Sequence, residues 1–312
     1  MMHVSTFTQP SGGTELQQTL WRRYVPFELQ TRIHLTVSAL PAPKRPLKPH
    51  VFWAHQAHDQ PSVQNLADPL VQRGIDAFVF VSEWQRDQYI RHLSVPQDRT
   101  YVVRNAIEPI ARHNKPAGPL RLVYTSTPFR GLDVLLQAFA QLRLTDVELH
   151  IYSGMGLYGR SSEDARYQAL YEKARSLPGV HYHGVVANAE VRQALKQSHI
   201  FAYPCTWEET SCISLIEALG AGCLAVVPDL AALPETAGGY ARMYPYQTDK
   251  NAHIAACTNA LQTAIVQYDQ SETTKRLSEQ VTHFATVYSW QQRTKEWEAL
   301  LQGIIKQYGR SI

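Results

Sequence analysis

The chain has 312 residues, of which 44% are hydrophobic and 18% charged, so it can bury a sizeable core and is neither disordered nor fibrous. This length favours two domains of roughly 150 residues each. The net charge of +3, without a clustered Lys/Arg stripe, argues against a nucleic-acid partner.

No apolar run approaches the roughly 18 residues that a membrane-spanning helix needs. The first 13 residues lack the basic flank and apolar stretch of a secretory signal. The cysteines fit no zinc-ligand spacing, and we expect reduced thiols at Cys205, Cys212, Cys223 and Cys257. Together these features predict a cytoplasmic protein.

The first third of the chain indicates a smaller sheet domain. Short apolar runs predict strands within 3–7, 32–40, 50–55 and 75–82, and a helix is expected from Glu15 to about Arg23. Residues 109–119 have interior breaks and few apolar side chains, which is typical of a linker. We therefore expect domains at 1–110 and 111–312.

The later two thirds alternate short apolar runs with amphipathic stretches. Strands are predicted within 120–126, 147–153, 180–186, 199–204 and 223–228. Helices are predicted within 131–142, 164–177, 189–198 and 213–222, and a terminal helix from Trp290 to about Tyr308. This alternation indicates an α/β fold with a parallel, doubly wound sheet, in which ligands bind outside the carboxyl ends of the strands.

A glycine pair near the start is the first chemically suggestive feature. Ser11, Gly12 and Gly13 follow a short predicted strand and precede the helix at Glu15. Glycines at such a place let backbone N–H groups approach a phosphate at a helix N-terminus. The same pattern is also that of an ordinary turn.

A carboxylate pair in the second domain is the other suggestive feature. Thr210 or Ser211 can cap a helix that starts near Ile213, which leaves Glu209 in the loop before it and Glu217 within it. If both were helical, the two carboxylates would point about 80° apart. With Glu209 in the loop, both can line one rim of a cleft beside a helix N-terminus that can accept a diphosphate.

At this pair the sequence resembles the family 4 group of retaining glycosyltransferases. Glu209 and Glu217 match the E-x7-E signature of that family. Further matches follow in the expected order: the Gly-Gly loop, VSEWQRDQYI from Val81, VVRNAIE from Val102, TPFRGLDVLLQAF from Thr127, HGVV from His183 and LPE from Leu233. The resemblance implies the GT-B fold, two Rossmann-like domains with parallel sheets facing across a cleft, here with a shortened N-terminal domain.

The resemblance also implies roles for individual residues. Glu209 would contact the hydroxyls of the donor sugar, Glu217 would hold the ribose, and Arg130 would lie beside the diphosphate. Backbone groups would bind the rest of the donor: the phosphates at Ser211, Cys212 and Ile213, the diphosphate from the opposite domain at Gly12 and Gly13, and the base at Gly184 and Val185.

Two of these residues have a plainer reading. Arg130 could be a solvated charge at a helix start, because Arg is mostly exposed in proteins. Many family members carry a second basic residue a few positions earlier, where this chain has Ser126 and Thr127, with Arg160 and Arg192 as candidate substitutes. His55, which the resemblance places near the acceptor, could equally be a hydrogen-bonded structural histidine. Asp59, close by in the sequence, could orient His55 or cap a turn.

The resemblance implies an enzyme: a retaining hexosyltransferase that moves a hexose from a nucleotide-diphosphate sugar to a hydroxyl of a glycan or glycan-bearing acceptor. The resemblance implies that the reaction needs no cofactor and no metal, and the absence of an Asp-x-Asp pair, which the metal-dependent fold uses to hold a divalent ion, is consistent with this. Peripheral membrane contact stays open, because lipid-linked acceptors are common in the family. The alternatives are a sugar-nucleotide epimerase of the same fold and a catalytically idle sugar-nucleotide-binding module.

Overall fold

The computed structural model describes residues 9–40 and 48–308 and consists of two compact units. The six-strand unit comprises residues 9–12, 108–208 and 213–286, and the four-strand unit comprises residues 13–107, 209–212 and 287–308. The chain therefore changes unit close to the predicted linker, and it also returns to the first sheet at its end. The predicted strand at 3–7 lies outside the described residues.

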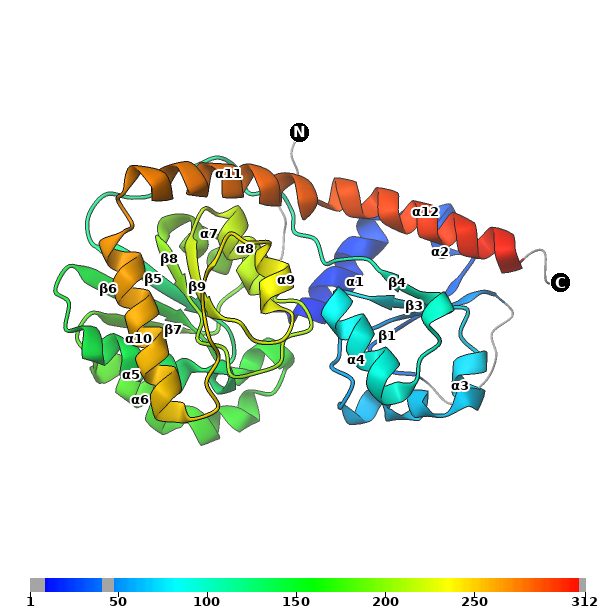
Figure 1. Cartoon of the computed structure of the whole chain (residues 1–312), viewed down its shortest axis with the longest axis horizontal. Coiled ribbons are helices and arrows are strands. Elements are labelled where there is room, and N and C mark those ends of the chain that lie inside the picture. Colours follow the sequence, from blue (N-terminus) through cyan, green and yellow to red (C-terminus); the bar gives the residue numbers. More distant parts are fainter. Residues whose placement is uncertain (1–8, 41–47, 309–312) are drawn as a thin grey trace. The chain divides into compact units, whose positions relative to one another are not determined.

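The four-strand unit is built on a parallel sheet in the order β1-β2-β3-β4, of which Figure 1 labels β1, β3 and β4. The strands are β1 (His34–Val37), β2 (His50–Trp53), β3 (Ala77–Phe80) and β4 (Thr100–Val102). The helices are α1 (Gly13–Tyr24), α2 (Phe27–Gln30), α3 (Pro69–Arg73), α4 (Glu83–Leu93) and α12 (Trp290–Tyr308), with 3-10 turns at Pro61–Ala67 and Gln97–Arg99. Every residue of β2 and β3 is buried, which explains why, apart from His50, these strands consist of apolar residues.

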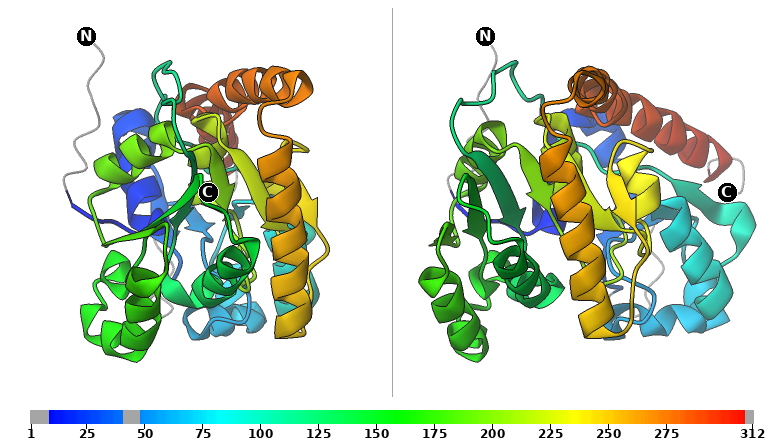
Figure 2. Two further views of the ribbon diagram at one scale, coloured as in Figure 1. Left: turned by 90° about the vertical axis from the view of Figure 1, so that its left-hand side faces the viewer. Right: turned by 60° about the vertical axis from the view of Figure 1, so that its left-hand side comes forward.

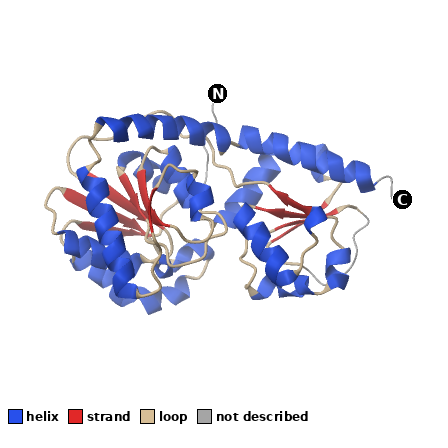
Figure 3. Ribbon diagram, in the orientation of Figure 1, coloured by secondary structure: helices blue, strands red, loops and turns tan. Residues whose placement is uncertain are grey.

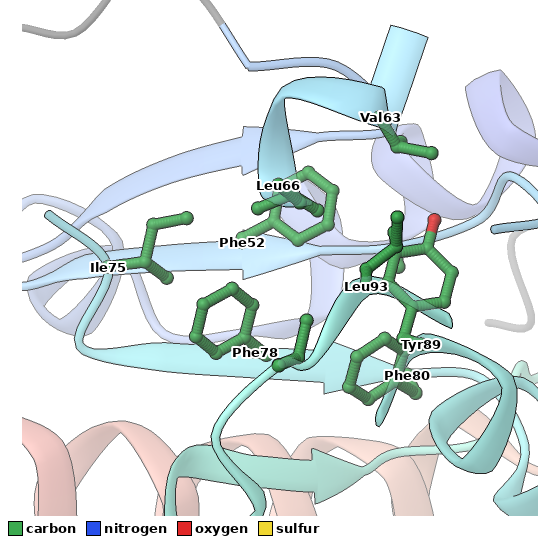
Figure 4. Packing of buried hydrophobic residues seen from close by; sticks show 10 residues of the cluster. Phe52, Val63, Leu66, Ile75, Phe78, Phe80, Tyr89 and Leu93 are labelled. Atoms are coloured by element: carbon green, nitrogen blue, oxygen red, sulfur yellow. The ribbon is translucent and has the colours of Figure 1, made fainter. Parts of the chain in front are cut away.

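A cluster of large side chains fills the space between this sheet and α4. Phe52 and Phe78 are register partners on neighbouring strands, with ring centroids 6.4 Å apart. Tyr89 of α4 packs against Phe80 at 4.9 Å, and Figure 4 shows Leu66 and Leu93 in the same cluster. Burial of these side chains holds the helix against the sheet.

Helix α12 packs on the four-strand unit through tryptophans. Trp297 is fully buried, and its ring lies 5.8 Å from Trp21 of α1 and 5.1 Å from Trp53 of β2. Trp290 stacks on Tyr24 at 5.5 Å. The predicted terminal helix is therefore present, but its partners belong to the first sheet rather than to the second half of the chain.

The six-strand unit is a parallel sheet in the order β10-β9-β8-β5-β6-β7. Its strands are β5 (Leu120–Thr125), β6 (Val147–Tyr152), β7 (Val180–Gly184), β8 (Ile200–Ala202), β9 (Leu224–Pro228) and β10 (Arg242–Tyr244). The chain runs from β5 outward to β7 and then restarts at β8 on the other side of β5. This reversal is a topological switch point, where doubly wound sheets bind ligands.

Helices flank the strands of each sheet (Figure 3). Those of the six-strand unit are α5 (Leu132–Leu142), α6 (Gln168–Ser176), α7 (Asn188–Gln197), α8 (Ile213–Gly220), α9 (Leu233–Ala237), α10 (Lys250–Val266) and α11 (Ser271–Val287), with 3-10 turns at Pro128–Arg130, Met155–Tyr158 and Ser161–Tyr167. Figure 2 shows α10 running alongside this sheet. The α/β fold with two parallel sheets is confirmed.

Candidate functional site: the carboxyl edge of β5 and β8

The switch point brings two loops of the six-strand unit together. One leaves the carboxyl end of β5 and leads through Pro128–Arg130 into α5, and the other leaves β8 and leads towards α8. Because β5 and β8 are hydrogen-bonded neighbours, both loops emerge at the same edge of the sheet. The predicted diphosphate residue Arg130 lies in the first loop.

Gly131 fixes the first loop against the second. Its φ angle is +102°, a left-handed conformation that side chains other than glycine rarely adopt. A Cβ atom at this position would lie 2.0 Å from the carbonyl oxygen of Pro204, so the two backbones approach more closely than any other residue permits. Thr206 Oγ1 also donates to the Phe129 carbonyl at 3.3 Å, and Phe129 lies edge-on to Trp207 at 5.5 Å.

Arg130 is therefore held beside the segment that follows Pro204. The residue is half-buried, and its guanidinium lies over the ring of Phe129, 5.4 Å from the centroid. A guanidinium in this setting can donate two parallel hydrogen bonds to a phosphate. The diphosphate role of Arg130 stays a prediction.

Helix α8 begins at the same edge. Ser214, in its first turn, donates through Oγ to the carbonyl of Thr125 at the end of β5, with a distance of 3.0 Å. The backbone N–H groups of the first helical turn have no intrahelical acceptor, and the helix dipole adds partial positive charge there. Ile213 thus begins a helix whose N-terminus lies at the carboxyl end of β5.

The segment just before α8 is anchored in the four-strand unit. Thr210 donates through Oγ1 to the carbonyl of His55 at 2.9 Å and accepts at its own carbonyl from Ser82 Oγ at 2.7 Å. Glu209 and Cys212, in this segment, are both buried. Of the predicted site residues, Glu209, Ser211 and Cys212 thus belong to the four-strand unit, whereas Ile213 and Glu217 belong to the six-strand unit.

Glu217 is a buried carboxylate of the six-strand unit. It is buried in α8, and its Oε1 lies 3.9 Å from Nε of Arg192 on α7. The same guanidinium donates to the carbonyls of Glu108 and Pro109 at 2.9 and 3.0 Å and lies 3.6 Å from the carboxylate of Glu108. Burial raises the pKa of Glu217; Arg192 opposes this rise and Glu108 adds to it.

The sequence predicted only part of the cluster formed by Glu108, Arg192 and Glu217. Glu108 ends the VVRNAIE motif, but the motif gives it no partner, and Arg192 was considered only as a substitute phosphate ligand. In the structure Arg192 lies beside the carboxylates of Glu108 and Glu217, and Arg160 pairs with Glu163. The spacing of Glu108 and Arg192, 84 residues apart, gave no signal of their contact.

The predicted base-binding loop closes the carboxyl end of β7. Gly184 has a φ angle of +73°, and its carbonyl accepts from Ser153 N at 2.9 Å. A Cβ on Gly154 would lie 2.4 Å from Cγ2 of Val185, so Gly154 leaves the space that Val185 occupies. The loop is consequently a packed structure with a defined backbone.

The glycine loop near the start is attached to the same unit through Ser11. The side chain of Asn188, the first residue of α7, accepts from Ser11 N at 2.8 Å and donates to the Ser11 carbonyl at 3.3 Å. Gly12 belongs to the six-strand unit, while Gly13 is the first residue of α1 in the other unit. A phosphate role for the two glycines stays a prediction.

His55 lies two residues beyond β2 in the four-strand unit. Its ring is 4.4 Å from Trp53, and complete burial lowers the pKa of His55 to about 3. Its Nε2 is buried and has no hydrogen-bond partner among the described residues, while Asp59 accepts from Gln60 instead. His55 is thus a neutral imidazole with a nitrogen still available for a hydrogen bond.

The comparisons with known proteins agree with this fold. Residues 120–263 match the family model described as "Glycosyl transferases group 1". A search of curated proteins found no match. No helix in the described ranges is long and apolar enough to cross a membrane.

Three solved structures share the two-unit architecture. A glycosyltransferase from Rickettsia africae ESF-5 aligns with 94% of this chain and 81% of its own, with a TM-score of 0.70 and 12% identity. Anabaena Alr3699/HepE in complex with UDP-glucose aligns with 82% of this chain and 72% of its own, with a TM-score of 0.66 and 16% identity. Sucrose-phosphate synthase from Thermosynechococcus elongatus aligns with 83% of this chain and 69% of its own, with a TM-score of 0.62 and 17% identity.

At these identities the structural matches establish the fold. The family match covers β5 to α10 and includes Arg130, Glu217 and the Gly184 loop. The chain therefore has the GT-B fold of glycosyltransferases, and its residues 120–263 match the group 1 glycosyltransferase family.

Proposed function

We propose that the protein is a retaining glycosyltransferase that moves a hexose from a nucleotide-diphosphate sugar to a hydroxyl of a glycan or glycan-bearing acceptor. The observation that carries this proposal is the convergence of Arg130 and the N-terminus of α8 at the switch point of the six-strand sheet. Both features favour a diphosphate at that edge. UDP-glucose in the Anabaena structure supports a nucleotide sugar as the donor.

The buried carboxylate of Glu217 supplies a second argument. Burying a carboxylate is costly unless it is paired, and here a single guanidinium is shared between Glu217 and Glu108. Ribose hydroxyls would donate hydrogen bonds to such a carboxylate and so satisfy it. We therefore assign Glu217 to the ribose of the donor, and Gly184 and Val185 to its base.

The transfer that we propose needs little beyond stabilisation of the leaving group. The bond between the anomeric carbon and the diphosphate oxygen breaks while the acceptor oxygen bonds to the same face of that carbon. The acceptor's proton passes to the departing diphosphate oxygen, so the configuration is retained. Arg130 and the N–H groups at the start of α8 would stabilise the negative charge that develops.

Two residues of the four-strand unit complete the proposal. We assign Glu209 to the hydroxyls of the donor sugar and His55 to the acceptor hydroxyl. Because its pKa is near 3, the His55 imidazole is neutral at physiological pH and can hydrogen-bond to a hydroxyl without adding charge. Gly12 and Gly13 would present backbone N–H groups to the diphosphate.

The experiment is a turnover assay followed by proton NMR. The protein is incubated with each of a panel of nucleotide-diphosphate hexoses, and the anomeric signal of the released sugar is recorded before it mutarotates. We expect slow hydrolysis of one donor with the anomeric configuration retained, and a strongly reduced rate for Glu209→Ala. Addition of acceptor glycans should raise the rate.

The two alternative functions, an epimerase and an idle binding module, predict different products in the same assay. An epimerase would convert the donor into a second nucleotide sugar of changed configuration without releasing the sugar. An idle binding module would bind a donor and never turn it over. Inversion at the anomeric carbon would contradict the retaining mechanism. A Glu209→Ala variant as active as the wild type would contradict the assignment of Glu209 to the donor sugar.

A further inference from the structure

A second cluster of polar side chains lies on one face of β6 and β7, at the edge of the six-strand sheet. Glu148 and His150 alternate along β6 with the buried Leu149 and Ile151. His181 stands beside His150 as its register partner on β7, the last strand of the sheet. The two histidine rings stack at 4.7 Å, so these side chains share one face.

The opposite face of β7 is covered while this one is open. Tyr182, which alternates with the histidines, stacks on Tyr171 of α6 at 4.9 Å. The side chains of Glu148, His150 and His181 are 29%, 19% and 48% exposed. A solvent-borne ion can therefore reach all three.

The distances within the cluster suit a small cation. His150 Nε2 lies 3.2 Å from Glu148 Oε2, and His181 Nε2 lies 4.0 Å from Glu148 Oε1. One ligand atom from each residue lies within 4.8 Å of the other two. Two ligands of a tetrahedral zinc ion at about 2.05 Å from the metal are about 3.3 Å apart, so only the exposed His181 must move appreciably.

We propose that Glu148, His150 and His181 form a zinc site that links β6 to β7, with water as the fourth ligand. Two imidazole nitrogens and one carboxylate oxygen are a donor set that zinc prefers. None of the three residues is assigned to the donor or acceptor in the proposed transfer. The site is thus separate from the chemistry for which we expect no metal.

A fourth residue, His183, positions the proposed metal ligand His150. His150 Nδ1 lies 3.1 Å from Nε2 of His183, whose ring stacks on Tyr152 at 4.3 Å. Without metal, His150 Nε2 hydrogen-bonds to Glu148 at 3.2 Å. Zinc would replace the proton on Nε2, and His150 would then donate from Nδ1 to His183, as outer hydrogen bonds do in known zinc sites.

The positive charge of Arg121 opposes zinc binding and so offers a further test of the proposed site. Arg121 of β5 is the register partner of Glu148, and its Nε lies 3.4 Å from Glu148 Oε2. Zinc must compete with this guanidinium for the carboxylate. The four cysteines, which would otherwise compete for the metal, are all buried.

The test is calorimetric titration of Zn²⁺ into the metal-free full-length chain near neutral pH. We expect one saturable zinc ion per chain and an affinity at least tenfold lower in each of His150→Gln and His181→Gln. His183→Gln should weaken zinc by about 10–100-fold through loss of the positioning hydrogen bond. Arg121→Gln should strengthen it.

Two measurements keep the outcome unambiguous. Thermal melts without zinc show whether each variant folds, and His283→Gln, a half-buried histidine on α11, serves as the matched control with unchanged zinc affinity. Absorption of the Co²⁺-substituted chain should show the strong visible bands of a tetrahedral site. No saturable binding, or equal zinc affinity in wild type, His150→Gln and His181→Gln, would overturn the proposal.

Discussion

At the scale of single residues, the notable feature is a carboxylate that the fold does not stabilise. Glu217 is buried in α8, shares Arg192 with Glu108, and has a raised pKa. The folded chain therefore binds a proton at Glu217 more tightly than the unfolded chain does. Residues retained at such a cost concentrate at functional sites.

Glu217→Gln should separate stability from function. The raised pKa means that the stability linked to this proton is fully present below the ordinary value of 4.5 and is lost as the pH rises through the folded-state pKa. We expect the variant to be at least as stable as the wild type at pH 7, with a flatter pH dependence above pH 4.5, yet to bind nucleotide more weakly. Denaturant unfolding across pH and nucleotide titration measure the two effects.

The matched control is Glu148→Gln. A hydrogen bond with His150 lowers the pKa of Glu148, so its contribution has the opposite sign and is lost as the pH falls. That variant should bind nucleotide normally. If Glu217→Gln instead destabilised the protein at pH 7, Glu217 would be a structural member of an ion pair.

The residue scale also shows what the sequence could predict of the site. The family resemblance that the E-x7-E spacing and its flanking motifs carry predicts roles for Glu209, Glu217 and Arg130, because all three lie in short local patterns. The contact of Arg192 with Glu108 joins residues 84 positions apart, and only the order of the strands brings them together. No local pattern encodes such a pair.

At the scale of elements, one glycine sets the shape of the loop between β5 and α5. Gly131 has a left-handed backbone and lies against the carbonyl of Pro204. It thereby joins the loop that carries Arg130 to the loop that leads to α8. The position of the predicted diphosphate ligand depends on this backbone contact.

Gly131→Ala should therefore damage both stability and nucleotide binding. The left-handed conformation alone costs a non-glycine residue about 1–2 kcal/mol, and the clash with Pro204 adds to that. Thermal unfolding and titration of a nucleoside diphosphate measure the two losses. Gly118→Ala is the matched control: its φ angle is +111° but nothing lies within 4 Å of the added atom, so it should lose stability and keep its nucleotide affinity.

Some strands and helices could be predicted from the sequence, and others could not. The buried strands β2, β3 and β9 were predicted because they consist almost entirely of apolar residues, and β5 because its last residues do. Strands β4 and β10, of three residues each, were missed because they are only partly buried and lack an apolar run, whereas β8, equally short but fully buried, was predicted. Periodicity also predicted α12 closely, but an apolar helix face does not specify which sheet it covers.

At the scale of the whole molecule, the last helix of the chain, α12, belongs to the four-strand unit, which is otherwise formed mainly by the first third of the sequence. The bridge between Ile107 and Ser289 and the packing of Trp297 on Trp21 and Trp53 attach residues 287–308 to the four-strand unit. A four-stranded sheet of about a hundred residues has a limited core. The tryptophans of α12 extend that core.

Trp297→Ala should destabilise the four-strand unit selectively. Removing a fully buried Trp costs about 3–5 kcal/mol. Hydrogen exchange resolved by peptide should show loss of protection in β2 and α1, with the strands of the six-strand unit unchanged. Phe27→Ala, an aromatic residue that is 76% exposed in the same unit, is the control and should change little; equal loss of protection in both units would contradict this organisation.

The central claim is that an activated sugar's diphosphate binds where β5 and β8 end, beside Arg130 and α8. The most direct measurement is the affinity of the wild type and of Arg130→Ala for a nucleoside diphosphate and for its parent nucleoside. Loss of charge-assisted hydrogen bonds worth about 1.5–3 kcal/mol predicts about 10–100-fold weaker binding of the diphosphate, and an unchanged nucleoside affinity.

Arg166→Ala is the matched control, since that arginine is 75% exposed and pairs only loosely with Glu163 at 3.6 Å. It should bind both ligands as the wild type does. Arg130→Ala that binds the diphosphate as tightly as the wild type, or that loses diphosphate and nucleoside equally, would contradict the account.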